Sequence, residues 1–208
     1  MNRIYILLIV FSIQLMQAQQ QDLQRANQLF GKTYYSAAIP LYEKVSAKNQ
    51  TVEIIQNLGD CYFYTNDYDK AQAQYAILSN NKNLNEDFYF RYSQTLKAKG
   101  KYDEANKILR EFYLASNNNA AIEKLDKDIK TLKNVGAIGQ RFDIQNLAIN
   151  TENSEFGAVI FGDNLVFAAV KKKPNLFDKT YKWNNESYLN LVSIPLKNAN
   201  SKDSIAAY

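Results

Sequence analysis

The chain has 208 residues with a formal net charge of +4, and 46% of them are hydrophobic and 13% aromatic. This composition excludes a disordered chain and allows one or two folded domains. The weak positive charge does not favour a nucleic-acid partner. The sequence has no histidine, no paired cysteines, no phosphate-binding glycine loop and no glycine-flanked serine. We therefore expect a protein that is not an enzyme and that holds no cofactor and no metal.

Residues 1–18 have the pattern of a secretory signal peptide. Arg3 precedes an apolar run over residues 4–13, and the small residue Ala18 stands before a glutamine-rich start. The alternative, a membrane span, needs about 20 apolar residues, and two glutamines interrupt this run. We predict cleavage after Ala18, which leaves no transmembrane span. Because Arg3 is the one charged residue removed, the net charge falls from +4 to +3.

Residues 19–117 contain a pattern that repeats at intervals of 33 and 34 residues. Repeats of this period are typical of helix pairs that bury their apolar faces on one another. Small residues let the two helices of a pair approach closely. Cys61 follows the same helical spacing, so we expect it to be a buried small hydrophobe. The aligned columns are Ala26, Gly59 and Ser93; Leu29, Tyr62 and Leu96; Tyr35, Tyr68 and Tyr102; Ala38, Ala71 and Ala105; and Tyr42, Tyr75 and Leu109.

The repeated segments resemble tetratricopeptide repeats. The second helix of such a repeat is similar to "YYSAAIPLY", "DYDKAQAQY" and "KYDEANKIL", and the first is similar to "NLGDCYFY". The first repeat departs from the pattern, with Arg25 and Ala26 where a Leu-Gly pair is usual, and the third has Tyr92 and Ser93 there. The resemblance implies an α-solenoid of three tetratricopeptide repeats over residues 19–117.

Residues 118–134 are predicted to form a capping helix. An asparagine N-cap candidate starts the segment, and apolar residues recur at helical spacing. Asp126 and Asp128 alternate with lysines, which favours a solvated helix face over a cation site. Two glycines and the loss of apolar periodicity predict a linker over residues 135–141. The apolar positions of the helix are Ile122, Leu125, Ile129 and Leu132.

Residues 142–208 have the composition of β-strands. "RFDIQNLAIN" at 141–150 and "SYLNLVSIPL" at 187–196 are strand-like, and Gly162 with Asp163 predicts a hairpin turn. The run over residues 165–170 is apolar on both faces, which indicates a strand inside a sheet. The lysines at 171–173 are interpreted as a solvated loop. We expect four side chains to be exposed unless further strands cover them, namely Val166, Phe167, Val170 and Leu191.

This order of elements resembles the opening blade of the WD40-like propellers that follow tetratricopeptide repeats in envelope proteins of the Bacteroidetes. Members of that family usually continue to an OmpA-like peptidoglycan-binding domain, and some belong to the type IX secretion and gliding machinery. One blade cannot close a propeller, which needs about four to eight. The fold class is therefore predicted as α + β multidomain: a tetratricopeptide solenoid followed by an incomplete antiparallel β-propeller that continues beyond Tyr208.

The resemblance implies a non-catalytic scaffold that binds other envelope proteins through its helical repeats. Its implied location is the periplasm, in association with the outer membrane or cell wall, and its contact with peptidoglycan is expected only through domains beyond this chain. The alternative is the N-terminal part of a propeller-bearing hydrolase, whose catalytic residues would follow Tyr208.

The partner-binding groove of a tetratricopeptide array is lined by the first helix of each pair. Asn27, Asn57 and Arg91 stand where related families grip a terminal carboxylate, but Leu23 and Asp87 replace the lysines of that pattern. The residues predicted to line the groove are Leu23, Asn27, Phe30, Gln56, Asp60, Phe63, Tyr64, Phe90, Gln94 and Lys97.

Overall fold

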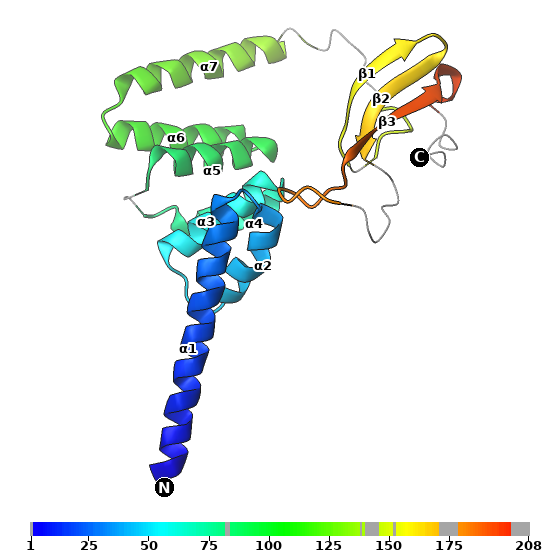
Figure 1. Cartoon of the computed structure of the whole chain (residues 1–208). Coiled ribbons are helices and arrows are strands. Elements are labelled where there is room, and N and C mark those ends of the chain that lie inside the picture. The colour runs from blue at the N-terminus through cyan, green and yellow to red at the C-terminus, as the bar shows by residue number, and fades with distance from the viewer. Residues whose placement is uncertain are drawn as a thin grey trace. The chain divides into compact units, whose positions relative to one another are not determined.

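The computed structural model describes residues 2–81, 84–137, 139, 146–151, 153–170 and 179–200, with side chains from residue 17 onward. The chain forms two compact units, Met1–Ala137 and Ile138–Tyr208, and each is described by itself. In the part that is described, the first unit is helical and the second holds a three-stranded antiparallel sheet (Figure 1). The chain is therefore an α + β protein.

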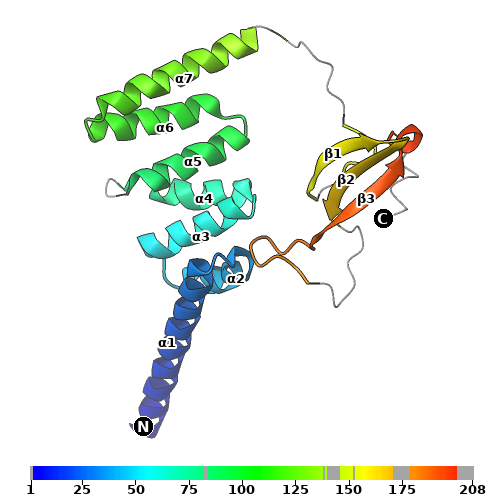
Figure 2. The ribbon, with the colours of Figure 1, turned by 45° about the horizontal axis from the view of Figure 1, so that its top comes forward.

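The helical unit is a row of helices in a repeat-like arrangement, in which each helix packs against the next one along the chain (Figure 2). Three antiparallel pairs, α1 with α2, α3 with α4 and α5 with α6, are followed by α7. The described helices are α1 (Asn2–Gly31), α2 (Tyr35–Ser46), α3 (Val52–Tyr64), α4 (Tyr68–Leu78), α5 (Glu86–Ala98), α6 (Tyr102–Ala115) and α7 (Asn119–Ala137).

Side-chain caps start α3, α5 and α7 at matching positions. Thr51, Asn85 and Asn118 each accept a hydrogen bond from the backbone N–H three residues further on, at 3.1 to 3.3 Å. Each bond satisfies one of the N–H groups that the first turn of a helix leaves without a partner. The caps follow the intervals of the sequence repeat, so α7 begins in the same way as the first helix of a pair.

The turn inside each helix pair also has a repeated geometry. The backbone φ is 60° at Thr33, 63° at Asn66 and 74° at Gly100. In each turn the N–H of the following residue donates to the carbonyl oxygen five residues earlier, at 2.9 Å. This is the Schellman arrangement, in which a residue of positive φ ends a helix and lets the chain reverse. The same type of turn therefore joins the two helices in each of the three pairs.

The small residues of the repeat columns lie where the two helices of a pair meet. Ala38, Ala71 and Ala105 are fully buried. A Cβ added to Gly59 would lie 2.8 Å from Cε1 of Tyr75, which no real side chain tolerates. The predicted close approach of α3 and α4 at Gly59 and Ala71 is thus confirmed.

Cys61 lies in the same helical core. Its side chain is completely buried and forms no disulfide. Burial raises the pKa of the thiol, because the thiolate is poorly solvated there. The prediction that Cys61 is a buried small hydrophobe is therefore confirmed.

The helices at the two ends of this unit are longer than expected. α1 runs without a break from Asn2 to Gly31, past Ala18, because residues 2–30 contain neither glycine nor proline. At the other end α7 continues to Ala137, three residues into the expected linker.

The sheet unit contains β1 (Glu155–Phe161), β2 (Asn164–Val170) and β3 (Leu189–Pro195) in the order β1-β2-β3. Gly162 and Asp163 form the turn between β1 and β2, and Gly162 has the positive φ that tight hairpins require. A bulge at Gly157, which also has positive φ, interrupts the β1–β2 register. The predicted hairpin and the central position of β2 are confirmed.

A small apolar cluster lies on one face of this sheet. Leu165, Phe167 and Ala169 of β2 pack there with Ile194 of β3 and with Ile149. The prediction that Phe167 is exposed without further strands is wrong, because Ile149 belongs to a turn that packs on this face. Residues 146–150, the described part of the expected strand at 141–150, are not a strand.

Two other expectations for the sheet unit have different outcomes. Val170 is buried as well, whereas Leu191 of β3 is 80% exposed and Val166 is half-buried. The expectation of exposure is therefore correct for Leu191 and wrong for Val170. The lysine run at 171–173 lies outside the described residues.

Candidate functional site

The first two helix pairs hold a polar contact around a buried tyrosine at equivalent positions. The Tyr42 hydroxyl donates to Oδ1 of Asn27 at 2.6 Å and accepts from Nδ2 of Asn57 at 3.1 Å. The tyrosine comes from α2, and the two asparagines come from the first helix of its own pair and of the next pair. This contact therefore ties α1, α2 and α3 together.

The second pair repeats the contact with charged groups. The Tyr75 hydroxyl donates to Oδ1 of Asp60 at 2.7 Å, and Nε of Arg91 donates to the same oxygen at 2.8 Å. The Asp60 and Arg91 side chains are only 5% and 15% exposed. Asp60, predicted to line an open groove, is instead inside the interface between α3, α4 and α5.

Burial dominates the electrostatics of this contact. Desolvation raises the pKa of the Asp60 carboxyl, although Arg91 and the Tyr75 hydroxyl act in the opposite direction. Desolvation also raises the pKa of the Tyr75 phenol, and the adjacent carboxylate adds to that rise. A buried carboxylate is stable only when paired and hydrogen-bonded, so Asp60 needs both partners.

These contacts leave little capacity for gripping a terminal carboxylate. Asn27 and Asn57 are engaged with Tyr42, and Arg91 is paired with Asp60, whose charge neutralises it locally. A ligand carboxylate at Arg91 would have to approach an existing carboxylate. The replacement of two pattern lysines by Leu23 and Asp87 already argued against capture of a terminal carboxylate. These contacts are a second, geometric reason against it.

A different surface opens between α5, α6 and α7, which we call the α5–α7 hollow. Its volume is about 380 Å³, within the range of about 300–1,000 Å³ that is usual for ligand pockets. Three of the ten predicted groove residues, Phe90, Gln94 and Lys97, lie together in its lining. The other lining residues are Tyr102, Asn106, Leu109, Tyr113, Ala121, Lys124, Leu125, Asp128, Ile129 and Leu132.

The α5–α7 hollow combines exposed apolar and charged side chains. Phe90, Tyr102 and Leu132 are each about half exposed, which is unusual for large apolar residues brought together in one place. Lys97 and Lys124 provide two positive charges, and Asp128 is the one acidic residue of the lining. This mixture suits a peptide better than a small apolar molecule.

The other predicted groove residues have structural contacts. Leu23 and Phe30 pack against the helical core, where the Phe30 ring meets Tyr35 edge-on. Tyr64 stacks on the same tyrosine with ring centres 4.5 Å apart. Phe63 meets the rings of Tyr64 and Tyr68 edge-on.

Gln56 lines a separate, more open depression, together with Asn57 and Glu53 at the start of α3. The sequence prediction thus mixed residues of the helix interfaces with residues of an open surface.

A second hollow of about 540 Å³ was not predicted from the sequence. It lies between the end of α4 and the helices α5 and α6, where the rings of Tyr89 and Phe112 stack with centres 4.5 Å apart. Tyr92 and Ile108 contribute apolar surface, and Glu111 contributes a negative charge. None of its lining residues belongs to a repeat column, so the repeat pattern did not indicate this hollow.

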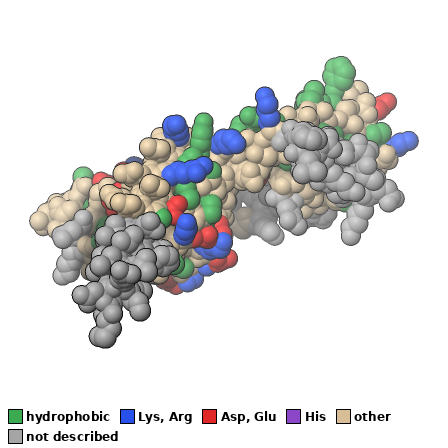
Figure 3. All heavy atoms as spheres, turned by 60° about the horizontal axis from the view of Figure 1, so that its bottom comes forward, with side chains coloured by type: hydrophobic (Ala, Val, Ile, Leu, Met, Phe, Trp, Pro, Cys, Tyr) green, Lys and Arg blue, Asp and Glu red, His purple; other side chains and the backbone are tan. Residues whose placement is uncertain are grey.

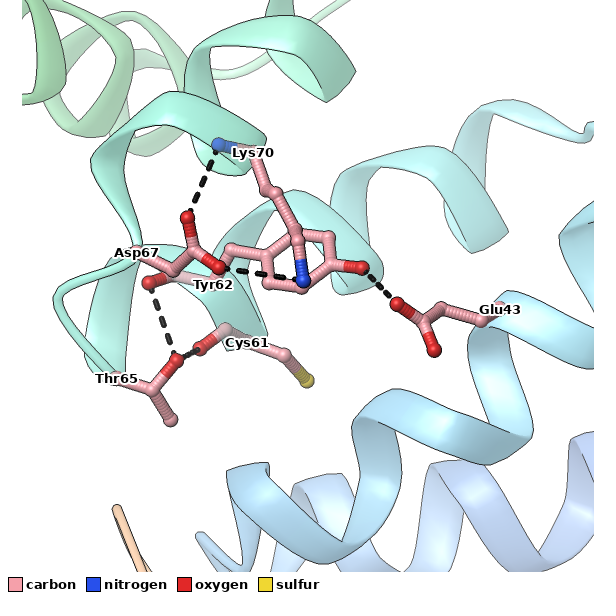
Figure 4. A network of polar contacts seen from close by, with 6 residues as sticks. All are labelled: Glu43, Cys61, Tyr62, Thr65, Asp67 and Lys70. Atoms are coloured by element: carbon pink, nitrogen blue, oxygen red, sulfur yellow. Dashed lines mark hydrogen bonds and ion pairs between the residues drawn. The ribbon is translucent and has the colours of Figure 1, made fainter.

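A polar network at α2, α3 and α4 has a structural role (Figure 4). The Tyr62 hydroxyl donates to Oε1 of Glu43 at 2.5 Å, and Nζ of Lys70 lies 5.1 Å from the centre of the Tyr62 ring. Asp67 caps α4 and pairs with Lys70 at 3.4 Å. These groups contact one another, so the network joins neighbouring helices.

The charged side chains of the described residues offer no candidate metal site. Among those residues no group of three or more His, Cys, Asp or Glu side chains could hold a metal ion. Asp126 forms an ion pair with Arg110. On the face shown in Figure 3, basic and acidic side chains lie next to one another.

The chain was compared with protein-family models, with curated proteins and with solved structures, and none of them matches. Of the helices described, none is both long enough and apolar enough to cross a lipid bilayer. The candidate site therefore depends on the geometry of the chain itself.

Proposed function

We propose that this protein is a non-catalytic scaffold whose tetratricopeptide-like helix pairs bind a protein partner. The observation that carries the proposal is the α5–α7 hollow, where half-exposed aromatic and aliphatic side chains lie beside two lysines. Exposed apolar surface of this kind marks interaction sites on folded proteins. The repeated caps and turns support the assignment to the tetratricopeptide class.

The proposed setting is the cell envelope. The first 18 residues resemble an export signal, and the order of helical repeats and sheet resembles envelope proteins that carry a WD40-like propeller. We propose that the protein acts in the periplasm near the outer membrane, in a secretion, gliding or wall-associated assembly. Contact with peptidoglycan is assigned to domains outside this chain.

The test is capture of partners by the full chain and by a double variant, Phe90→Ser with Lys97→Glu. Both side chains lie in the α5–α7 hollow and are at least partly exposed, so the fold is retained while the surface changes. We expect envelope proteins that co-purify with the unchanged chain to be lost. Quantitative mass spectrometry of cross-linked envelope fractions measures this loss.

A matched control is Ile77→Ser with Lys107→Glu, which makes the same kinds of change at exposed positions outside this hollow. We expect the control to capture the same proteins as the unchanged chain. Equal capture by all three proteins would refute the proposal that the hollow binds the partner.

A further inference from the structure

The α5–α7 hollow occupies a position that the first two repeats fill with a tyrosine. Tyr42, Tyr75 and Leu109 are each the eighth residue of the second helix of a pair. The first two of these side chains are fully buried tyrosines, and their hydroxyl groups are hydrogen-bonded. Leu109 is buried as well, but it has neither ring nor hydroxyl, and it lines the hollow.

The polar partners of the tyrosines also have equivalents around the hollow. Asn57 and Arg91 stand six residues after the N-caps of α3 and α5, and Lys124 stands six residues after the N-cap of α7. By the repeat intervals, Gln94 corresponds to Asn27 and Asp60. Gln94 and Lys124 both line the hollow. The third repeat thus keeps polar groups of the tyrosine site but lacks the tyrosine.

We propose that the α5–α7 hollow receives an aromatic side chain, a tyrosine above all, from an acidic segment of a partner protein. The ring would occupy the space beside Leu109 that Tyr42 and Tyr75 occupy in their repeats, with Gln94 and Lys124 near its hydroxyl. This proposal rests on the proposed function, because it names the chemistry of the partner at the same site.

The charges around the hollow favour acidic residues next to that aromatic residue in the partner segment. Lys97 and Lys124 are opposed within the lining by Asp128 alone, so the surface favours carboxylates on the incoming segment. The half-exposed side chains of Phe90 and Leu132 provide apolar contact for the ring. Charge and apolar surface therefore point to the same class of peptide.

The probe is a fluorescein-labelled peptide of nine residues with a central tyrosine and two glutamates on each side, titrated with the full chain by fluorescence anisotropy. Replacing its tyrosine by alanine should weaken binding about tenfold or more. Replacing its glutamates by lysines should weaken binding about threefold or more, an effect that added salt reduces. Absence of binding at about 1 mM chain, or equal binding of the alanine peptide, would overturn the proposal.

Variants of the chain test the position of the ring. Leu109→Tyr restores the residue type of the first two repeats, fills the hollow from inside and should reduce peptide affinity about tenfold. Circular dichroism shows whether this variant is folded. Gln94→Ala and Lys124→Glu change the rim without touching the core, and each should weaken binding about threefold. Lys130→Glu, on the same helix but outside the lining, is the matched control and should bind the peptide as the unchanged chain does.

Two patterns of failure are distinguishable. If Leu109→Tyr is folded and binds the peptide with full affinity, the aromatic subsite is refuted. If partner capture is then still lost in the Phe90→Ser with Lys97→Glu variant, the proposed scaffold function stands without this subsite. Binding that is unchanged in Leu109→Tyr, Gln94→Ala and Lys124→Glu alike, together with full capture by the double variant, would refute both.

Discussion

The helical unit and the sheet unit differ in how they bury apolar surface. In the helical unit each pair of helices lies against the next, and Tyr42, Tyr75 and Leu96 are fully buried. In the sheet unit the described residues bury Leu165, Phe167 and Ala169 on one face of the sheet. The opposite face leaves Phe161 and Leu191 77% and 80% exposed. Each helix pair buries the apolar face of its neighbour, whereas a three-stranded sheet with two apolar faces needs an additional layer to bury the second face.

The same difference predicts which unit is more stable at neutral pH. The helical core is continuous from Ala26 to Ala105, while the cluster under the sheet is built from a few residues around Phe167. We therefore expect the sheet unit to unfold first. The one tryptophan of the chain, Trp183, belongs to the sheet unit and reports on it, whereas far-ultraviolet circular dichroism reports mainly on the helices.

Alkaline pH should reverse this order and gives the largest expected effect. Burial raises the pKa of Tyr42, Tyr62, Tyr75 and Cys61 in the folded helical unit. Their ordinary pKa values are about 8.5 for the thiol and about 10 for the phenols. The unfolded chain therefore loses these protons as the pH rises, while the folded unit keeps them. Stability is fully present below about pH 8 and is then lost at about 1.4 kcal/mol per pH unit for each group beyond its unfolded pKa.

Thermal unfolding at pH 8 and pH 11, followed by circular dichroism and by Trp183 fluorescence, measures this reversal. We expect the helical unit to lose roughly 7 kcal/mol between these values. Tyr181 and Tyr188 of the sheet unit are nearly half exposed, so they offer no comparable burial. An unchanged helical transition at pH 11 would contradict the burial of these groups.

Gly59→Ala should have a smaller effect, confined to the helical unit. The added methyl group would lie 2.8 Å from Cε1 of Tyr75, so the α3–α4 pair has to separate. We expect the free energy of unfolding to fall by about 1–3 kcal/mol, as for other overpacked cores. Urea unfolding followed by circular dichroism measures this loss.

Gly136→Ala is the matched control for that substitution. Gly136 is also helical, and a Cβ there would meet no atom within 4 Å. The control should be neutral or more stable by up to about 1 kcal/mol, because alanine favours the helix. A loss in the control as large as that of Gly59→Ala would show that the close contact with Tyr75 is not the cause.

Leu191→Ser should have the smallest effect. The side chain is mostly exposed, so its removal should change the stability of the sheet unit by less than about 0.5 kcal/mol. Phe167→Ala, on the buried face of the same sheet, should instead remove the Trp183 transition or shift it strongly. A large loss for Leu191→Ser would mean that its face of the sheet is covered in solution.

Local patterns in the sequence predicted the parts of the fold that depend on one or two residues. The repeat of Ala38, Ala71 and Ala105 predicted the helix contacts, and Gly162 predicted the hairpin turn. The turn at residues 146–150 was missed, because its apolar residues resemble a strand, and only packing under the sheet decides otherwise.

The candidate site was predictable only in part. Phe90, Gln94 and Lys97 were found because the first helix of each pair was expected to line a groove. Asp60 was misplaced because its helical position alone does not show that Tyr75, fifteen residues further on, reaches its carboxylate. The hollow itself is lined jointly by residues of α5, α6 and α7, which no single segment encodes.

The N-cap at Asn118 has a consequence for how such a chain can grow. It restarts the pattern of Thr51 and Asn85, so the chain enters α7 through the same kind of N-cap that opens the second and third pairs. An in-frame duplication of residues 85–117 would add one helix pair and would join Asn117 to Asn85, so that an N-cap asparagine again follows Asn117, as Asn118 does now. Gene duplication could therefore lengthen the row by whole pairs, leaving α7 at its end.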